Sequence, residues 1–185
     1  MPMRRTPPAF ILILTLVTAM SARGFAQHPL LLQGESRLVK LAAGGQVEWE
    51  MPWGGIHDLW TLDNGHLLVQ QGAAKVAEID PATKQIVWSY DSASQNGNAG
   101  KQVEVHAFQP LAGGLVMIAE SGPGRIIEVN RQGELVHELK LKVDHPHPHT
   151  DTRLARKLPT GNYLVCHEGD GTVREYDGKS GVIVW

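Results

Sequence analysis

The sequence predicts an all-β fold built from a repeated sheet of about four antiparallel strands. A glycine recurs 49 and then 47 residues apart, at Gly65, Gly114 and Gly161, each time ahead of an apolar run. No segment shows a sustained helical period, and short runs rich in Val, Ile, Leu, Tyr and Trp alternate with Gly, Asn, Asp and Pro. Four strands that recur every 40 to 50 residues or so are typical of the blades of a β-propeller.

The first complete repeat shows where the strands are expected, in the segments IHDLWTL, HLLVQQ, KVAEID and QIVWSY. A glutamate recurs in the third strand of each repeat: Glu78, Glu128 and Glu175. A large ring recurs in the fourth strand: Trp88, His137 and Trp185. A tryptophan on an outer strand covers the seam to the next blade, so the seam at His137 is expected to be looser or more polar. A β-sandwich of similar hairpins would not keep these residues in register.

The expected blades cover residues 29–52, 56–91, 105–141 and 152–185. The first has three strands and lacks its innermost one, so the chain holds about three and three-quarter blades. This is short of the roughly four to eight blades of a closed ring. Two interpretations stay open: the chain is the N-terminal portion of a longer protein, or it closes by pairing with a second chain.

Residues 1–26 have the features of a secretory signal peptide. Arg4 and Arg5 precede an apolar run at 9–20, and small residues follow at 24–26. The run is short for a membrane span, and an uncleaved N-terminal anchor is the alternative. We therefore expect the domain at 27–185 to be secreted or periplasmic, with no membrane span once the signal is cleaved.

Charge and cysteine content exclude several classes of function. Without residues 1–26, the chain has 14 Lys and Arg against 19 Asp and Glu, a net charge of about −5. Such a surface repels phosphate backbones, so nucleic acid is not an expected partner. Cys166, the single cysteine, lies in an apolar run and is expected in the core rather than in a disulfide. No Gly-x-Ser-x-Gly elbow or phosphate-binding loop supports a serine hydrolase or a nucleotide enzyme.

The segments IDPATKQIVW and YDGKSGVIVW are similar to the repeat of the quinoprotein-like (PQQ-like) β-propeller superfamily. Asp80 to Trp88 and Asp177 to Trp185 both span eight positions, and Gly181 matches the family glycine whereas Lys84 departs from it. The resemblance covers residues 29–185 and implies the propeller fold. It does not fix the activity, since the superfamily includes dehydrogenases, scaffolds and sulfotransferases.

The resemblance raises the question of two activities, quinone-dependent oxidation and sulfuryl transfer. Quinone-dependent members carry an adjacent cysteine pair against the cofactor, and with Cys166 alone this chain cannot form one. PQQ is therefore not expected, and no cofactor is predicted. The segment IHDLWTLDNGHLLV also looks like the blades of bacterial arylsulfotransferases. That resemblance implies a central histidine that accepts a sulfuryl group, without saying which histidine it is here.

Three candidate site residues lie eight positions before the recurring glycine: His57, His106 and Arg153. Each opens the first strand of a blade, and these strands line the central channel of a propeller. Two imidazoles and a guanidinium suit a small anionic ligand, or another protein, at the channel face. The alternative is that they only satisfy strand-end backbone groups. His57 and His106 are the catalytic candidates, and the neighbouring Asp58 is expected to point the opposite way and to be structural.

The run DHPHPHTD at 144–151 contains the metal-ligand types His145, His147 and His149. Residues before proline favour extended or polyproline conformations, and alternate residues of a polyproline helix point in different directions. We expect a stiff connector between blades, with the three histidines as weak metal candidates. His149 is nearest to Arg153 and joins the predicted ligand-binding set.

The sequence thus predicts an exported β-propeller that acts as a binding or scaffold module through its channel face and inter-blade loops. The alternative is an arylsulfotransferase-like enzyme that uses a channel histidine, and a quinone-dependent dehydrogenase has less support.

Overall fold

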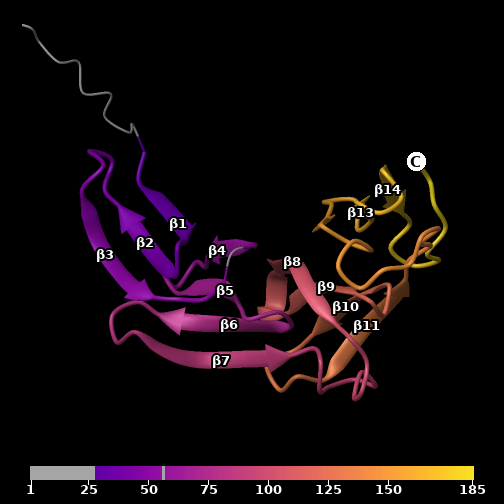
Figure 1. Ribbon diagram of the computed structural model, residues 1–185, viewed down its shortest axis with the longest axis horizontal. Helices are drawn as coiled ribbons and strands as arrows, with labels where there is room; N and C mark the ends of the chain where they lie inside the picture. Colours follow the sequence, from indigo (N-terminus) through magenta and orange to yellow (C-terminus); the bar gives the residue numbers. More distant parts are fainter. Residues whose placement is uncertain (1–27, 56) are drawn as a thin grey trace, which may run out of the picture.

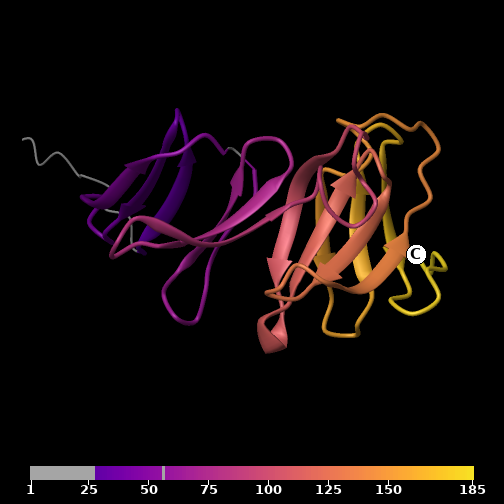
Figure 2. The ribbon, with the colours of Figure 1, turned by 90° about the horizontal axis from the view of Figure 1, so that it is seen from below.

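The computed structural model describes residues 28–55 and 57–185, and the predicted signal peptide lies outside the described residues. The described chain is nearly all β, with fourteen strands and one short 3-10 turn, η1 (Ala112–Gly114). Figures 1 and 2 show four sheets that follow one another in chain order and form an open arc, with β4 and β8 toward its middle. The fold is that of an incomplete β-propeller of antiparallel blades.

Each sheet is an antiparallel meander in which consecutive strands pair. Sheet 1 contains β1 (Leu30–Gly34), β2 (Arg37–Leu41) and β3 (Val47–Pro52). Sheet 2 contains β4 (Leu59–Thr61), β5 (Leu67–Gln71), β6 (Lys75–Asp80) and β7 (Gln85–Asp91). Sheet 3 contains β8 (Glu104–Pro110), β9 (Val116–Ser121), β10 (Arg125–Val129) and β11 (Leu135–Lys140). Sheet 4 contains β12 (Leu154–Lys157), β13 (Tyr163–His167) and β14 (Thr172–Tyr176).

The last expected strand, at residues 181–185, differs from the expectation. It runs antiparallel to β14 but makes only one isolated bridge, between Tyr176 and Ile183. Backbone hydrogen bonds on either side of the bridge join Asp177 N to Val182 O and Val184 N to Glu175 O. The pairing is therefore that of the other fourth strands but extends over fewer residues.

The predicted register of the repeats is confirmed. Glu78 lies opposite Trp88 in sheet 2, and Glu128 lies opposite His137 in sheet 3, with a β-bulge directly after each pair. In sheet 4, the Glu175 amide donates to the Trp185 carbonyl at 2.7 Å, which is the same pairing. The recurring glycines follow the first strands of sheets 2, 3 and 4 in turns with φ of 83°, 78° and 92°, a conformation that favours glycine.

Two seams between sheets are closed by tryptophan. Trp49 Nε1 donates to the Pro81 carbonyl at 2.7 Å, from sheet 1 to sheet 2. Trp88 Nε1 donates to the Arg131 carbonyl at 2.9 Å, from sheet 2 to sheet 3. The hydrogen bond fixes the ring while its apolar area covers the seam.

The third seam lacks a tryptophan. The His137 ring stacks on Tyr163 with centroids 6.0 Å apart, and its Nε2 is buried with no hydrogen-bond partner among the described residues. A cavity of about 550 Å³ opens here, with Glu128 and Lys157 in its wall. A cavity of about 570 Å³ also lies at the seam between sheets 2 and 3, so a looser, more polar seam at His137 stays a prediction.

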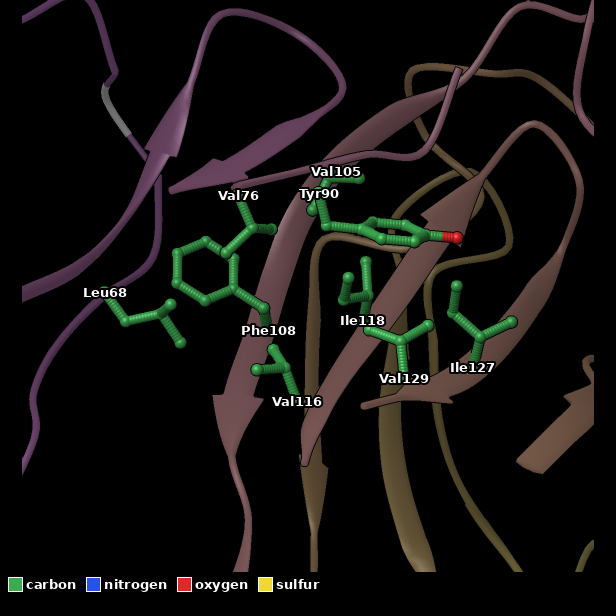
Figure 3. Packing of buried hydrophobic residues seen from close by; sticks show 9 residues of the cluster. All are labelled: Leu68, Val76, Tyr90, Val105, Phe108, Val116, Ile118, Ile127 and Val129. Atoms are coloured by element: carbon green, nitrogen blue, oxygen red, sulfur yellow. The ribbon is translucent and has the colours of Figure 1, made fainter. Parts of the chain in front are cut away.

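An apolar cluster lies between each pair of neighbouring sheets. Figure 3 shows the one between sheets 2 and 3, where Leu68, Val76 and Tyr90 face Phe108 and Ile118. All five side chains are fully buried, and each such side chain stabilises the fold by about 1.5–3 kcal/mol. These clusters hold the innermost strands in fixed positions.

Candidate functional site

The three residues predicted from the glycine register lie at the same end of the innermost strands. His57 and Arg153 come one or two residues before β4 and β12, and His106 lies inside β8. A β-bulge occurs at His106, because Val105 and Ala107 pair with consecutive residues of β9. A bulge redirects a side chain, and here it accompanies a histidine that faces the neighbouring sheets.

The structure brings all four predicted ligand-binding residues together. The ring centroids of His57 and His106 are 4.5 Å apart, and those of His106 and His149 are 5.2 Å apart. Arg153 Nη1 lies 3.4 Å from Nε2 of His106 and 3.4 Å from Nε2 of His149. We call the following residues the axial cluster: His57, Glu104, His106, His149 and Arg153.

Glu104 is the member of the axial cluster that was not predicted. Its Oε2 lies 3.1 Å from His106 Nε2 and 2.7 Å from His149 Nδ1. Burial alone would raise the pKa of Glu104, but hydrogen bonds from His149 and His106 outweigh it and hold the pKa below its usual value. The carboxylate is therefore charged and joins two of the histidines.

Backbone contacts fix the cluster. The Thr152 carbonyl lies 2.9 Å from His106 Nδ1. The buried side chain of Gln70 donates to the Val105 carbonyl at 2.8 Å and accepts from the His57 amide at 3.2 Å. Gln70 thereby joins sheet 2 to sheet 3 directly beside the two rings, and sequence analysis did not identify it.

The electrostatic environment keeps His57 neutral. Burial lowers its pKa, and Coulombic interactions with the neighbouring His106, Arg153 and His149 lower it further, against an opposing effect of Glu104. Arg153 is itself paired, because its Nε lies 2.6 Å from Glu168 Oε2. The arrangement thus offers a neutral imidazole next to a guanidinium whose Nη end faces the cluster.

The histidines of the Pro-rich run have different neighbours. His145 Nδ1 lies 3.2 Å from Asp170 Oδ1, and its side chain is 76% exposed. The backbone amide of His147 donates to Asp151 Oδ1 at 2.5 Å. Only His149 reaches the axial cluster. The three therefore do not meet at one point, in line with the geometric argument made from the sequence.

Asp58 follows His57 in the chain but belongs to a different set of contacts. Its carboxylate accepts from Arg156 Nη1 at 2.6 Å and Nη2 at 3.0 Å, and from the Phe108 amide at 3.2 Å. The Arg156 guanidinium lies 5.0 Å from the Trp60 ring, whose Nε1 donates to the Phe108 carbonyl at 2.8 Å. We call Asp58, Trp60 and Arg156 the axial tie, because they join sheets 2, 3 and 4.

The four antiparallel sheets and the register of their repeats define the class of the protein as a β-propeller. A family profile described as "Outer membrane protein assembly factor BamB" matches residues 34–185, and the chain belongs to this family. No curated protein sequence matches the chain. Among the described residues, no helix has the length and apolar character needed to cross a membrane.

Solved structures share the fold. A protein of unknown function from Bacteroides caccae matches with a TM-score of 0.58 and 12% identity, over 87% of this chain and 57% of its own. The WD40 propeller domain of Doa1 has a TM-score of 0.60 and 15% identity, over 84% and 49%. BamB from Moraxella catarrhalis has a TM-score of 0.51 and 15% identity, over 81% and 42%. The chain thus spans about half the length of these structures.

Proposed function

We propose that this protein is an exported β-propeller that serves as a binding or scaffold module, with the axial cluster as its ligand site. The observation that carries the proposal is the meeting of His57, His106 and Arg153 from three separate sheets, with rings 4.5 Å apart and Arg153 Nη1 3.4 Å from His106. Loops and inner-strand ends of a rigid propeller are the usual places for such sites.

The side chains favour a small anion as the ligand. The guanidinium of Arg153 presents a planar donor fork that suits carboxylate, sulfate or phosphate groups. The imidazoles can donate or accept as the ligand requires. Glu104 is the one carboxylate of the cluster, and its Oε2 already contacts both His106 and His149.

Family membership supports a second element of the proposal, a protein partner outside the cytoplasm. The family description refers to an assembly factor of outer membrane proteins. We infer that this propeller also works with other proteins in the periplasm, through its loops and channel face. The predicted signal peptide at residues 1–26 agrees with that location.

Ligand binding is tested by calorimetric titration of the purified protein with sulfate, phosphate and a dicarboxylate. Arg153→Gln is expected to weaken the binding of the preferred anion at least tenfold. Arg37→Gln is the matched control, since Arg37 lies on the surface beside Glu35 and Glu50, and it should bind as the wild type does. Equal binding by the wild type and Arg153→Gln would contradict an anion site at the cluster.

Sulfuryl transfer is the second candidate function, and it is favoured by the backbone contact that fixes the orientation of the His106 ring. A nucleophilic histidine needs a partner that fixes its ring, and the Thr152 carbonyl lies 2.9 Å from His106 Nδ1, which leaves the lone pair of a neutral ring on Nε2. In such a reaction the lone pair of a cluster histidine attacks the sulfur of an aryl sulfate, and the S–O bond to the departing phenolate breaks. An acceptor hydroxyl then attacks the sulfur, the S–N bond breaks to give back the imidazole, and the hydroxyl proton passes to the Glu104 carboxylate beside it.

The assay for this candidate follows sulfuryl transfer from a phenolic sulfate to a second phenol. Transfer that is lost in both His57→Ala and His106→Ala, and kept in His145→Ala, would support the enzyme. If the wild type gives no transfer while binding anions, the binding module is the better description.

A further inference from the structure

Three side chains of the axial cluster form a potential metal-ligand set. Glu104, His106 and His149 each offer one ligand atom, and these atoms lie within 4.8 Å of one another. One carboxylate and two imidazoles are a donor set that suits Zn²⁺ and related first-row transition metals. A set of three protein ligands leaves a coordination position open.

The contacts of His106 are a second, independent observation. Its Nδ1 lies 2.9 Å from the Thr152 carbonyl, which can only accept, so Nδ1 carries its proton. In a neutral ring, Nε2 then holds a lone pair, and this atom lies 3.1 Å from Glu104 Oε2. Two electron-rich atoms this close need a cation between them, either a proton or a metal ion.

The surroundings of His106 resemble those of a metal ligand. Histidines that bind metals commonly donate their other N–H to a backbone carbonyl, which fixes the ring and makes the ligating nitrogen more basic. Glu104 Oε2 lies 3.1 Å from His106 Nε2 and 2.7 Å from His149 Nδ1. Zinc bonds of about 2.0–2.2 Å at tetrahedral angles place neighbouring ligand atoms about 3.3–3.6 Å apart, so both contacts would lengthen by under about 1 Å on binding.

We propose that Glu104 Oε2, His106 Nε2 and His149 Nδ1 bind a divalent transition-metal cation of the Zn²⁺ class. Arg153 Nη1, now 3.4 Å from both imidazole rings, turns outward on binding, and its side chain is one-third exposed and held to Glu168 through Nε. The inference deepens the proposed function and rests on it in one respect: the metal and Arg153 together supply the positive charge that an anion meets.

The test uses tag-free full chain that has been treated with a chelator and dialysed, and Zn²⁺ alone is the titrant. Calorimetry and elemental analysis are expected to give one zinc per chain, and Co²⁺ in its place should give d–d absorption bands. Glu104→Gln and His149→Ala should each weaken zinc binding at least 100-fold. His145→Ala is the matched control, because His145 belongs to the same run but contacts Asp170 instead, and it should bind zinc normally.

Two controls make the result decisive. Glu104→Gln preserves the shape of the side chain, and His149 is half exposed in a loop, so thermal melting should show that both variants remain folded. Failure of the wild type to bind stoichiometric zinc would show that a proton joins Glu104 to His106, and the metal proposal would be overturned. Equal loss of zinc in His145→Ala would also overturn it.

A further variant separates the metal from the ligand. Arg153→Gln should keep zinc and lose anion affinity. Zinc binding without any anion binding would support the metal and contradict the proposed ligand. Anion binding that is unchanged by zinc and by Glu104→Gln would support the ligand and contradict the metal.

Discussion

The axial tie and the axial cluster start from adjacent residues of the chain, yet they differ in how well their polar atoms are satisfied. In the tie, each oxygen of Asp58 accepts from Arg156 and from a backbone amide, of Phe108 or of Leu59. In the cluster, one carboxylate oxygen of Glu104 is shared by two imidazoles, and a guanidinium faces the same rings. The comparison teaches that polar residues on inner strands stabilise the fold where each of their polar atoms has its own hydrogen-bond partners. Where several side chains share one partner atom, as in the cluster, they can exchange that contact for a ligand.

The largest effect is expected from breaking the tie. Asp58→Ala leaves the Arg156 guanidinium and the Phe108 amide without their partner. Loss of one partner of a fully buried ion pair costs about 3–5 kcal/mol, and because Arg156 is 31% exposed we expect a loss of about 2 kcal/mol. Urea unfolding measures it. Asp63→Ala, at an exposed turn, is the control and should change the free energy of unfolding by under about 0.5 kcal/mol.

A smaller loss is expected from the aromatic member of the tie. Trp60→Phe removes the N–H that donates to the Phe108 carbonyl and weakens the contact with the Arg156 guanidinium. We expect destabilisation of about 1 kcal/mol. In a double-mutant cycle with Asp58→Ala, the two losses should not add, because both residues contact Arg156. Simple additivity would show that the tie is not a single unit.

Glu104→Gln should change stability less than either substitution in the tie. The amide keeps the shape of the carboxylate and can still accept from one histidine, so the expected loss is under about 1 kcal/mol. Urea unfolding in the presence of a chelator measures this contribution without bound metal. A loss as large as that of Asp58→Ala would mean that the cluster is structural, and the contrast with the tie would fail.

The smallest effect on stability is expected from Asp170, a carboxylate outside both the tie and the cluster, and it is confined to acidic pH. Burial alone would raise the pKa of Asp170, but the amides of Asp144 and His145, the His145 ring and Arg174 lower it to about 2. A carboxyl whose pKa is lower in the folded state stabilises the fold above its unfolded value. This contribution should be lost as the pH falls from about 4 to about 2. Melting temperatures of the wild type and Asp170→Asn should therefore converge over that range.

Much of the fold could be predicted because the repeat imposes the same local chemistry at each copy. Gly65 and Gly161 are needed for turns of positive φ, and an aromatic ring lies opposite Glu78 and Glu128 on the neighbouring strand. The extent of the last strand could not be predicted, because its length depends on how many residues pair with β14 rather than on composition. Residues 1–26 lie outside the described residues, so the signal peptide stays a prediction.

The site was predictable only where it follows the repeat. His57, His106 and Arg153 occupy equivalent positions, so their meeting follows from the propeller itself. Glu104 and Gln70 act across 45 and 35 residues of chain, on His149 and Val105, and such contacts depend on how loops and sheets pack. Glu104 was still within reach of sequence reasoning, since residues two apart on a strand share a face and His106 was already a candidate.

The ion pair between Asp58 and Arg156 joins residues 98 positions apart, and this has a consequence for folding. In repeat proteins each unit touches mainly its neighbours, so units can open one at a time. Here sheet 4 cannot detach without releasing a charge held beside sheet 2, which couples units that are not consecutive. Amides of β5 and β13 should accordingly exchange through one shared opening event. Amides of β1 and β2 should exchange through a separate opening event and at a faster rate.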